Sequence, residues 1–166
     1  MVKKTSVATH VRTPQARLSE AGMHLILGYQ LAQAGVVTTQ VFDAQVRAKH
    51  GLRRGEFTML VLIKGNPDVT ARQLARALDV TPPNVALWID RLQALGLLTR
   101  ERSDSDARMQ HLRTTAKGTS LVDRLVQSLV QSEHAVLSTL SPAEHAMLLE
   151  LLHKAALARG RGEGST

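Results

Sequence analysis

The stretch TARQLARALDVTPPNVALWIDRLQALG, residues 70–96, decides the fold of this chain. It begins at Thr70, a favourable N-cap residue, and Gln73 three residues later completes the capping box that opens a helix. Apolar residues then recur with a helical period as far as Leu78. The sequence therefore predicts a helix over Ala71–Leu78.

A second helix is expected after a very short turn. Asp79-Val80 forms the turn, and Thr81 can cap the helix that follows. Pro82 stands at the first helical position, where its missing N–H removes no hydrogen bond, and Gly96 supplies a left-handed C-cap. We therefore expect a helix over Pro82–Leu95, and the two helices together have the spacing of a helix-turn-helix.

A β-hairpin is expected directly after this helix pair. The segments Leu97–Arg102 and Arg108–Thr114 have the character of strands, and the polar segment Ser103–Ala107 between them has the character of a turn. A hairpin in this place is a wing. The predicted fold class is mainly α with a small β-hairpin wing (α+β), a winged helix-turn-helix.

Further helices are expected on both sides of this module. The segment Leu18–Lys49 contains no proline and is followed by Gly51, a suitable helix end. A shorter helix is predicted over Arg53–Lys64. On the other side, Thr115–Gly118 leads into a long apolar-faced helix, and Ser141 opens the last helix with a second capping box.

The composition favours a polyanionic partner. The 166 residues carry a formal net charge of +7, which is typical of proteins that meet DNA, RNA or an anionic membrane. No apolar run reaches the length of a membrane-spanning helix, the N-terminus lacks the apolar region of a secretory signal, and no membrane partner is expected. The absence of cysteine excludes disulfides and thiolate metal sites within this chain, and it fits a cytoplasmic location.

Sequence signals for other classes of protein are missing. We find neither a Gly-rich phosphate loop nor a nucleophile elbow, and the acidic residues of the wing turn do not suggest a pocket. The seven histidines are scattered, without the i, i+4 pair of a helical metal site. We therefore expect no enzyme, no cofactor and no metal site.

Several short motifs are modest alone and specific in combination. They are Leu74-Ala75, Val80-Thr81-Pro82, Asp90-Arg91-Leu92, Gly96-Leu97-Leu98, Arg100, Asp104-Ser105-Asp106-Ala107-Arg108 and Leu112-Arg113-Thr114-Thr115-Ala116-Lys117-Gly118. In this order, over about 25–157, the chain resembles the MarR family of bacterial regulators. It departs from the family pattern at Gln93 and at Ala107, where the family wing carries an arginine.

The resemblance implies a triangular homodimer whose first and last helices interleave. The chain is then expected to be a transcriptional regulator, by family default a repressor, that binds a pseudo-palindrome in double-stranded DNA. It would act at the bacterial nucleoid, and a small ligand would release it from DNA or change its affinity. The alternative is an architectural winged-helix protein without a specific operator or effector. The expected division is 1–17 as a disordered basic tail, 18–50 as a dimerisation helix, 51–118 as the DNA-binding domain, 119–158 as C-terminal dimerisation helices and 159–166 as a disordered tail.

The second helix of the pair is expected to enter the major groove. If Val85, Ile89 and Leu92 face inward, the outward candidates are Thr81, Pro83, Asn84, Leu87 and Arg91, and the helix N-terminus adds its positive end. Asn84 can read adenine or contact phosphate. Leu87 is either an apolar contact to a thymine methyl or a core residue, and Trp88 is expected in the core rather than as a stacking platform.

The wing and the preceding helix supply further DNA candidates. By the resemblance, Arg108 enters the minor groove and Asp106 orients it; a plain solvated charge pair is the alternative. Arg100 either contacts phosphate or pairs with Asp90. The remaining wing candidates are Arg102 and Ser103, and the backbone candidates are Thr70, Arg72 and Arg76, for which a solvated face is equally open.

The resemblance also implies a ligand crevice near the dimerisation helices. Candidates for binding an aromatic acid or its acyl thioester are His24, Tyr29, Arg47, Arg53 and Arg54. The alternative is ordinary packing for the first two residues and solvated charge for the arginines. The sequence names neither the operator nor the effector.

Overall fold

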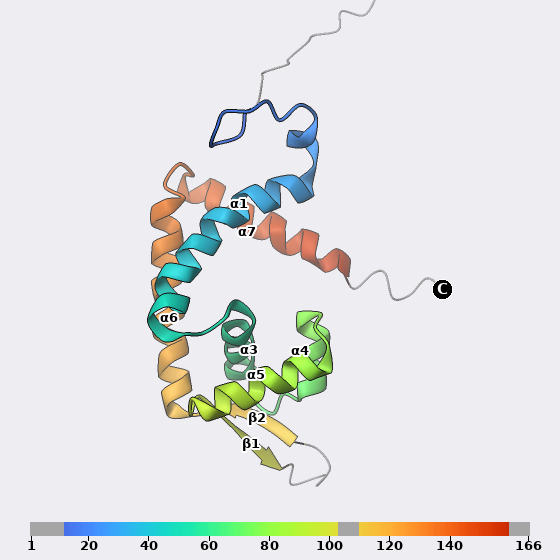
Figure 1. Cartoon of the computed structure of the whole chain (residues 1–166), viewed down its shortest axis with the longest axis vertical. Coiled ribbons are helices and arrows are strands. Elements are labelled where there is room, and N and C mark those ends of the chain that lie inside the picture. Colours follow the sequence, from blue (N-terminus) through green and yellow to red (C-terminus); the bar gives the residue numbers. More distant parts are fainter. Residues whose placement is uncertain (1–11, 103–109, 160–166) are drawn as a thin grey trace, which may run out of the picture. The chain divides into compact units, whose positions relative to one another are not determined.

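The computed structural model describes residues 12–102 and 110–159, and it divides into two compact units between Gly51 and Leu52 (Figure 1). Both units are helical, and the C-terminal unit also contains one antiparallel hairpin. None of the helices in the described ranges combines the length and the apolar character needed to cross a membrane.

The N-terminal unit contains one long helical run that starts later than the sequence suggested. The predicted helix over 18–49 begins with a 3-10 turn and only then becomes α-helical. A reason for the delay is that Ala21 adopts a left-handed backbone with φ of 48°, which no helix residue can do. The run ends at Gly51, also left-handed with φ of 67°, as predicted. Its parts are η1 (Met23–Leu25), α1 (Leu27–Phe42), the π-helical η2 (Asp43–Arg47) and α2 (Ala48–His50).

The C-terminal unit confirms the predicted order of elements. Its helix-turn-helix matches the predicted bounds to within one residue, and the turn is made by Asp79, which takes a left-handed conformation with φ of 55°. The capping boxes at Thr70 and Ser141 are both formed. The elements are α3 (Arg54–Gly65), α4 (Ala71–Leu78), α5 (Pro82–Ala94), β1 (Leu98–Arg102), β2 (Gln110–Thr114), α6 (Ala116–Val136) and α7 (Pro142–Ala156).

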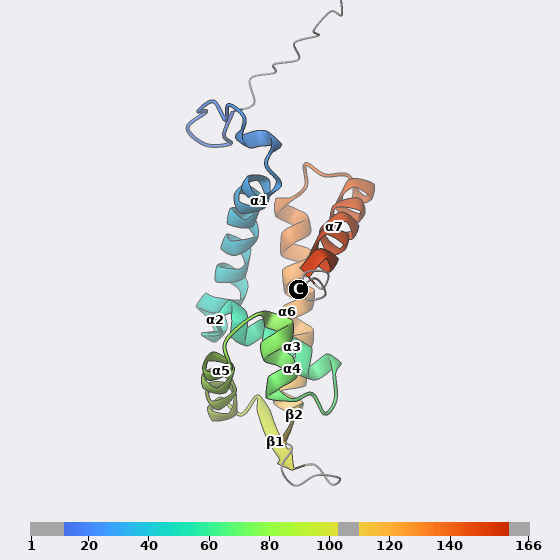
Figure 2. The ribbon, with the colours of Figure 1, turned by 90° about the vertical axis from the view of Figure 1, so that its right-hand side faces the viewer.

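The hairpin lies at one end of the C-terminal unit, beyond α3, α4 and α5 (Figures 1 and 2). Its strands pair in a register that sets Arg100 opposite Leu112. Val69, just before α4, adds an isolated bridge to Leu112 and accepts its backbone N–H at 3.0 Å. The hairpin is therefore fastened to the loop that leads into the helix-turn-helix.

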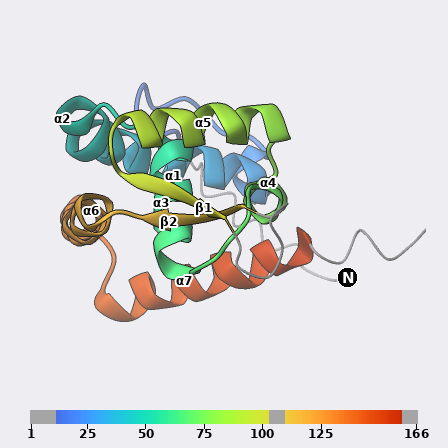
Figure 3. The same ribbon diagram turned by 90° about the horizontal axis from the view of Figure 1, so that it is seen from below.

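An aliphatic core orients α5. Val85, Ile89 and Leu92 recur at helical spacing and are all buried, so this face of α5 packs against α3, α4 and β1 (Figure 3). The predicted inward face is confirmed. The opposite face of α5 is left exposed.

The start of α6 clamps the end of α5. Thr115 donates its hydroxyl to the carbonyl of Gly96 at 2.8 Å and its N–H to the carbonyl of Leu97 at 3.1 Å. Lys117 Nζ donates to the carbonyl of Leu95 at 2.8 Å. Leu95 is the C-cap residue of α5, and Gly96 and Leu97 form the turn that follows it, so these bonds hold the segment that leaves the helix. Gly118 is required because a Cβ there would lie 2.0 Å from the carbonyl oxygen of Leu97.

Substituting Gly118→Ala is expected to lower the free energy of unfolding by about 1–3 kcal/mol, since the added methyl group forces two backbone segments apart. Urea denaturation followed by circular dichroism measures the change. The matched control is Gly65→Ala, where a Cβ meets nothing within 4 Å. A Gly118→Ala protein as stable as the control would contradict the clamp.

Candidate nucleic-acid interface

All five residues predicted for the outward face of α5 are exposed, Arg91 with a side chain that is 41% exposed. Thr81, Pro83, Asn84 and Leu87 are all exposed, and the Leu87 side chain is 61% exposed. The core alternative for Leu87 is therefore wrong. A large apolar side chain on an outward helix face next to an amide is suited to touching a thymine methyl beside an adenine edge.

The N-terminus of α5 offers fewer free N–H groups than an ordinary helix. Pro82 and Pro83 occupy its first two positions and have no N–H to donate. The next N–H, that of Asn84, bonds the carbonyl of Thr81 at 3.0 Å. The predicted anion site at this helix end is thus weakened, and phosphate contact falls to side chains. The Thr81 hydroxyl makes no capping bond to the first turn, so this hydroxyl is available to contact a phosphate.

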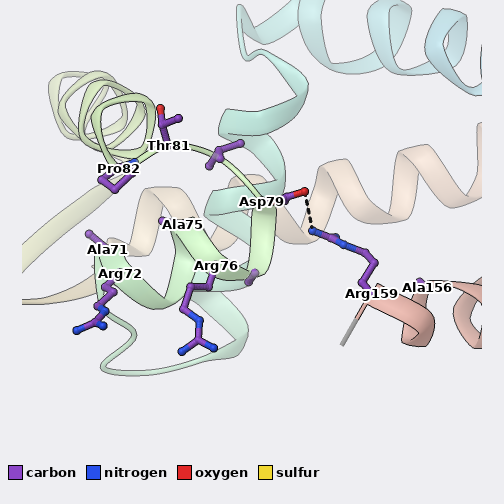
Figure 4. A pocket seen from close by; sticks show the side chains of 11 residues that line it. Ala71, Arg72, Ala75, Arg76, Asp79, Thr81, Pro82, Ala156 and Arg159 are labelled. Carbon is purple, nitrogen blue, oxygen red and sulfur yellow. Dashed lines mark ion pairs between the residues drawn. The ribbon is translucent and has the colours of Figure 1, made fainter. Parts of the chain in front are cut away.

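The exposed side of α4 presents two arginines. Arg72 and Arg76 extend from the same side of the helix (Figure 4). They line a hollow to which the segment after α7 contributes Arg159, and Arg159 lies 3.5 Å from Asp79. Thr70 is less available than expected, because its hydroxyl accepts the N–H of Gln73 and bonds that residue's side chain.

Ion pairs tie the strands to their surroundings. The Arg100 guanidinium pairs with Asp90 on α5, which favours the structural role for Arg100 over a free phosphate contact. Arg113 lies 2.9 Å from Glu101 across the hairpin and 2.5 Å from Asp68 in the loop before α4.

The segment 103–109 between the two strands lies outside the described residues. Ser103, Asp106 and Arg108 lie outside the described residues, and Arg102 is described only by its backbone, at the end of β1 opposite Gln110. The roles predicted for these four residues stay predictions.

Arg91 lies on the edge of the outward face, and its guanidinium reaches inward. Its Nη1 lies 3.1 Å from Oε1 of Glu56, whose side chain is 1% exposed. The other oxygen of Glu56 accepts the backbone N–H of Arg53 at 2.8 Å. Sequence reasoning missed Glu56. The available signal was an acidic residue at the third position of a helix, where it can cap the first turn.

A second contact joins α5 to the first turn of α3. Trp88 is half-buried, and its ring covers Gly55 so closely that a Cβ there would lie 2.4 Å from the nearest ring atom. The expected burial of Trp88 is thus partly met. Gly55 is the residue that makes room for the ring.

The five ligand candidates fall into two sets, each within its own unit. His24, Tyr29 and Arg47 belong to the N-terminal unit, where Arg47 lies 3.8 Å from Asp43. Arg53 and Arg54 open α3 in the C-terminal unit.

Tyr29 shares its surroundings with a buried carboxylate that the sequence reasoning did not select. Partial burial, together with a hydrogen bond to Glu20 and its negative charge, raises the pKa of Tyr29 above the usual value. Glu20 is buried, and its Oε2 and His24 Nδ1 have no hydrogen-bond partner among the described residues.

Comparison with known proteins agrees with this arrangement. The sequence model of the MarR family matches residues 50–109. A regulatory protein assigned to the hcr operon of Thauera aromatica is 27% identical over 139 residues, which cover 84% of each chain. The regulator PecS of Dickeya dadantii is 28% identical over 131 residues, which cover 77% of this chain and 78% of PecS. These relatives are transcriptional regulators and not enzymes.

A solved structure supports the fold over most of the chain. The transcriptional repressor CouR, bound to a 23-mer DNA duplex, superposes with a TM-score of 0.75 at 28% sequence identity, covering 84% of this chain and 98% of CouR. The observed winged helix-turn-helix with flanking helices is therefore the fold of a DNA-binding repressor.

Substituting Glu20→Gln is expected to lower the pKa of Tyr29 towards the ordinary tyrosine value of about 10, because it removes the negative charge that disfavours tyrosinate. Tyr29 is the only tyrosine of the chain, so the absorbance of tyrosinate during a pH titration reports it alone. Asp43→Asn is the control in the same unit. An unchanged titration midpoint in the Glu20 variant would contradict the contact.

Proposed function

We propose that this chain, which belongs to the MarR family of transcriptional regulators, is a repressor that binds a pseudo-palindromic operator as a homodimer and is released by a small ligand. The exposed face of α5, with Asn84 and Leu87 outward over a buried aliphatic face, is the observation that carries the proposal. Such binding would place the protein at the nucleoid, in the bacterial cytoplasm.

Base reading by α5 would be sparse. Asn84 can hydrogen-bond an adenine edge and Leu87 can contact a thymine methyl, while Pro83 offers no donor. The wing would add Arg108, held by Asp106, in a narrow minor groove, where A·T-rich sequence attracts an arginine. Thr81, Arg72 and Arg76 would contact phosphates, which position the protein without specifying sequence.

The apolar faces of the terminal helices support a second copy as partner. No residue of α7 is buried, although large apolar side chains make up much of this helix, and an isolated helix of such length is marginal in water. Exposed apolar patches of this kind mark interaction surfaces. The exposed residues are Met23, Leu25, Ile26, Leu27, Leu31 and Val36 near or on α1, Val126, Val130 and Val136 on α6, and Met147, Leu148, Leu149 and Leu151 on α7.

The effector would be a small aromatic acid or its thioester. A structural neighbour at 23% identity, BpsR of Bordetella bronchiseptica, is regulated in its DNA binding by 6-hydroxynicotinic acid, which supports this class of compound. Among our candidates an anionic group suits Arg47, Arg53 and Arg54 better than Tyr29, because Tyr29 already neighbours the Glu20 carboxylate. The ligand would act by preferring the conformation that does not fit DNA.

Footprinting on the DNA upstream of the gene that encodes this chain tests the proposal. A protected pseudo-palindrome with half-sites about one helical turn apart supports a dimeric regulator, and loss of protection with one aromatic acid or thioester identifies the effector. Uniform coating of any duplex would support the architectural alternative, which the low hydrogen-bonding capacity of α5 favours.

Substituting Asn84→Ala is expected to weaken operator binding by about 5- to 150-fold, since a lost bidentate base contact costs about 1–3 kcal/mol. Fluorescence anisotropy with the operator and with an unrelated duplex measures the loss. Arg72→Ala is the contrast: it should weaken both duplexes alike and reduce the salt dependence by roughly one phosphate contact. Equal losses on both duplexes for Asn84→Ala would refute base reading.

Substituting Leu151→Glu is expected to separate the dimer, because it places a charge in the apolar face of α7. Sedimentation equilibrium should then return the mass of one chain, 18.1 kDa, and operator binding should fall with it. The control is Glu150→Gln, which changes only an ion pair with Lys154. A wild-type chain that sediments as a monomer would overturn the homodimer.

A further inference from the structure

The buried carboxylate of Glu56 links α5 to the first turn of α3. Both oxygens of Glu56 are engaged, Oε2 by the backbone N–H of Arg53 and Oε1 by the guanidinium of Arg91 on α5. We propose that Glu56 and Arg91 are positioning residues that set α5 for base contact, and that Arg91 is not itself a contact to DNA. This inference rests on the proposed function.

The burial of Glu56 makes its partners important. A carboxylate that is 1% exposed is costly to bury unless it is paired and hydrogen-bonded, so the fold favours any orientation of α5 that keeps Arg91 in place. The pair between Arg100 and Asp90 also holds α5, but Asp90 is largely exposed and such pairs contribute little. The Glu56 link is therefore the stronger restraint of the two.

Trp88 makes the same joint directional. It stands three residues before Arg91, and side chains at this spacing share one side of a helix. Its ring lies over Gly55, next to Glu56 in the chain. One turn of α5 thus meets one turn of α3 at two places, the Trp88 ring on Gly55 and the Arg91 guanidinium on Glu56. A rotation of α5 would press the ring against the Gly55 backbone or draw it away, and it would move Arg91 relative to the Glu56 carboxylate.

The consequence falls on Asn84 and Leu87, which share a helical stripe with Trp88 and Arg91 because the four residues are spaced three, four and seven apart. Asn84 and Leu87 lie on the same rigid helix, so a small rotation at the joint displaces both from the base edges. Sites that read a ligand need their groups held to within about half an ångström. Loss of the joint should therefore weaken operator binding even though Glu56 is too deeply buried to reach DNA.

The test is a double-mutant cycle of Glu56→Gln and Arg91→Gln, in which fluorescence anisotropy measures the affinity for DNA. The duplex is the operator found by footprinting. Where footprinting finds none, it is a duplex selected from random sequences of roughly 30 base pairs, about three helical turns. Each single variant should lose roughly 2- to 30-fold in affinity, and the double variant should lose no more than the weaker-binding single. The slope of affinity against salt should stay at the wild-type value in all three. Arg91→Lys, which keeps the charge, should retain most of the affinity.

Two readouts separate this role from general loss of stability. Trp88 is the only tryptophan of the chain, so its emission in the absence of DNA should shift in both single variants. Asp123→Asn, which breaks the pair between Lys64 on α3 and α6, is the matched control and should change neither emission nor affinity. Circular dichroism at the assay temperature verifies that each variant is folded, and Arg91→Gln and Arg91→Lys decide the matter if Glu56→Gln does not fold.

The outcomes are distinct. If Glu56→Gln binds the duplex as wild type does, the positioning role is wrong. If Arg91→Gln lowers the salt slope by about one contact, the positioning role is also wrong and Arg91 contacts phosphate. Additive losses in the double variant would overturn it as well. A wild-type protein that selects no duplex would instead remove the proposed function itself.

Discussion

The seat of α5 on α3 is the constraint on which the rest of this structure depends. The helix has to bury Val85, Ile89 and Leu92 and at the same time present Asn84 and Leu87 to solvent. The core is almost entirely aliphatic, since the chain contains two phenylalanines, one tryptophan and one tyrosine. Aliphatic cores tolerate shifts before they lose stability. The hydrogen bonds from Thr115 and Lys117 at the end of α5 and the contacts of Glu56 depend on direction, so they fix an orientation of α5 that aliphatic packing alone does not.

Most helix and strand bounds were predictable because their signals are local. The Thr70–Gln73 and Ser141–Glu144 boxes and the left-handed Gly96 fix helix ends through contacts three or fewer residues apart. Ser141 also lowers the pKa of Glu144 by hydrogen bonds to its carboxylate, as a formed capping box should. The beginning of the first helix was missed because residues 18–22 offer no such signal, and the left-handed turn at Ala21 has no sequence signature of its own.

The candidate site was predictable only where it follows from helical period. The inward and outward residues of α5 follow from its sequence, and only the choice for Leu87 needed the structure. Contacts between distant segments leave no local trace: Glu56 meets Arg91, and Asp68 meets Arg113, across long intervals of chain. The DNA contact expected of Arg91 stays a prediction: its position on the helix is outward, as predicted, but a long flexible side chain can also turn to a buried partner, and here it pairs with Glu56.

These observations limit where regulation could act in the proposed dimer. A ligand can shift DNA binding only if it binds two conformations with different affinity. Within one C-terminal unit α5 is fastened at its end by Thr115 and Lys117 and along its length by Glu56, so its outward face changes little unless the joint itself breaks. A ligand would then act on the distance between the two α5 helices of the dimer. This distance has to match the spacing of the two half-sites, and a rigidly held α5 cannot adjust to a wrong spacing. Ligand control therefore requires that α5 is held firmly on α3. A loosely held α5 could stay bound to its half-site when the dimer changes conformation, and the ligand would then not release the DNA.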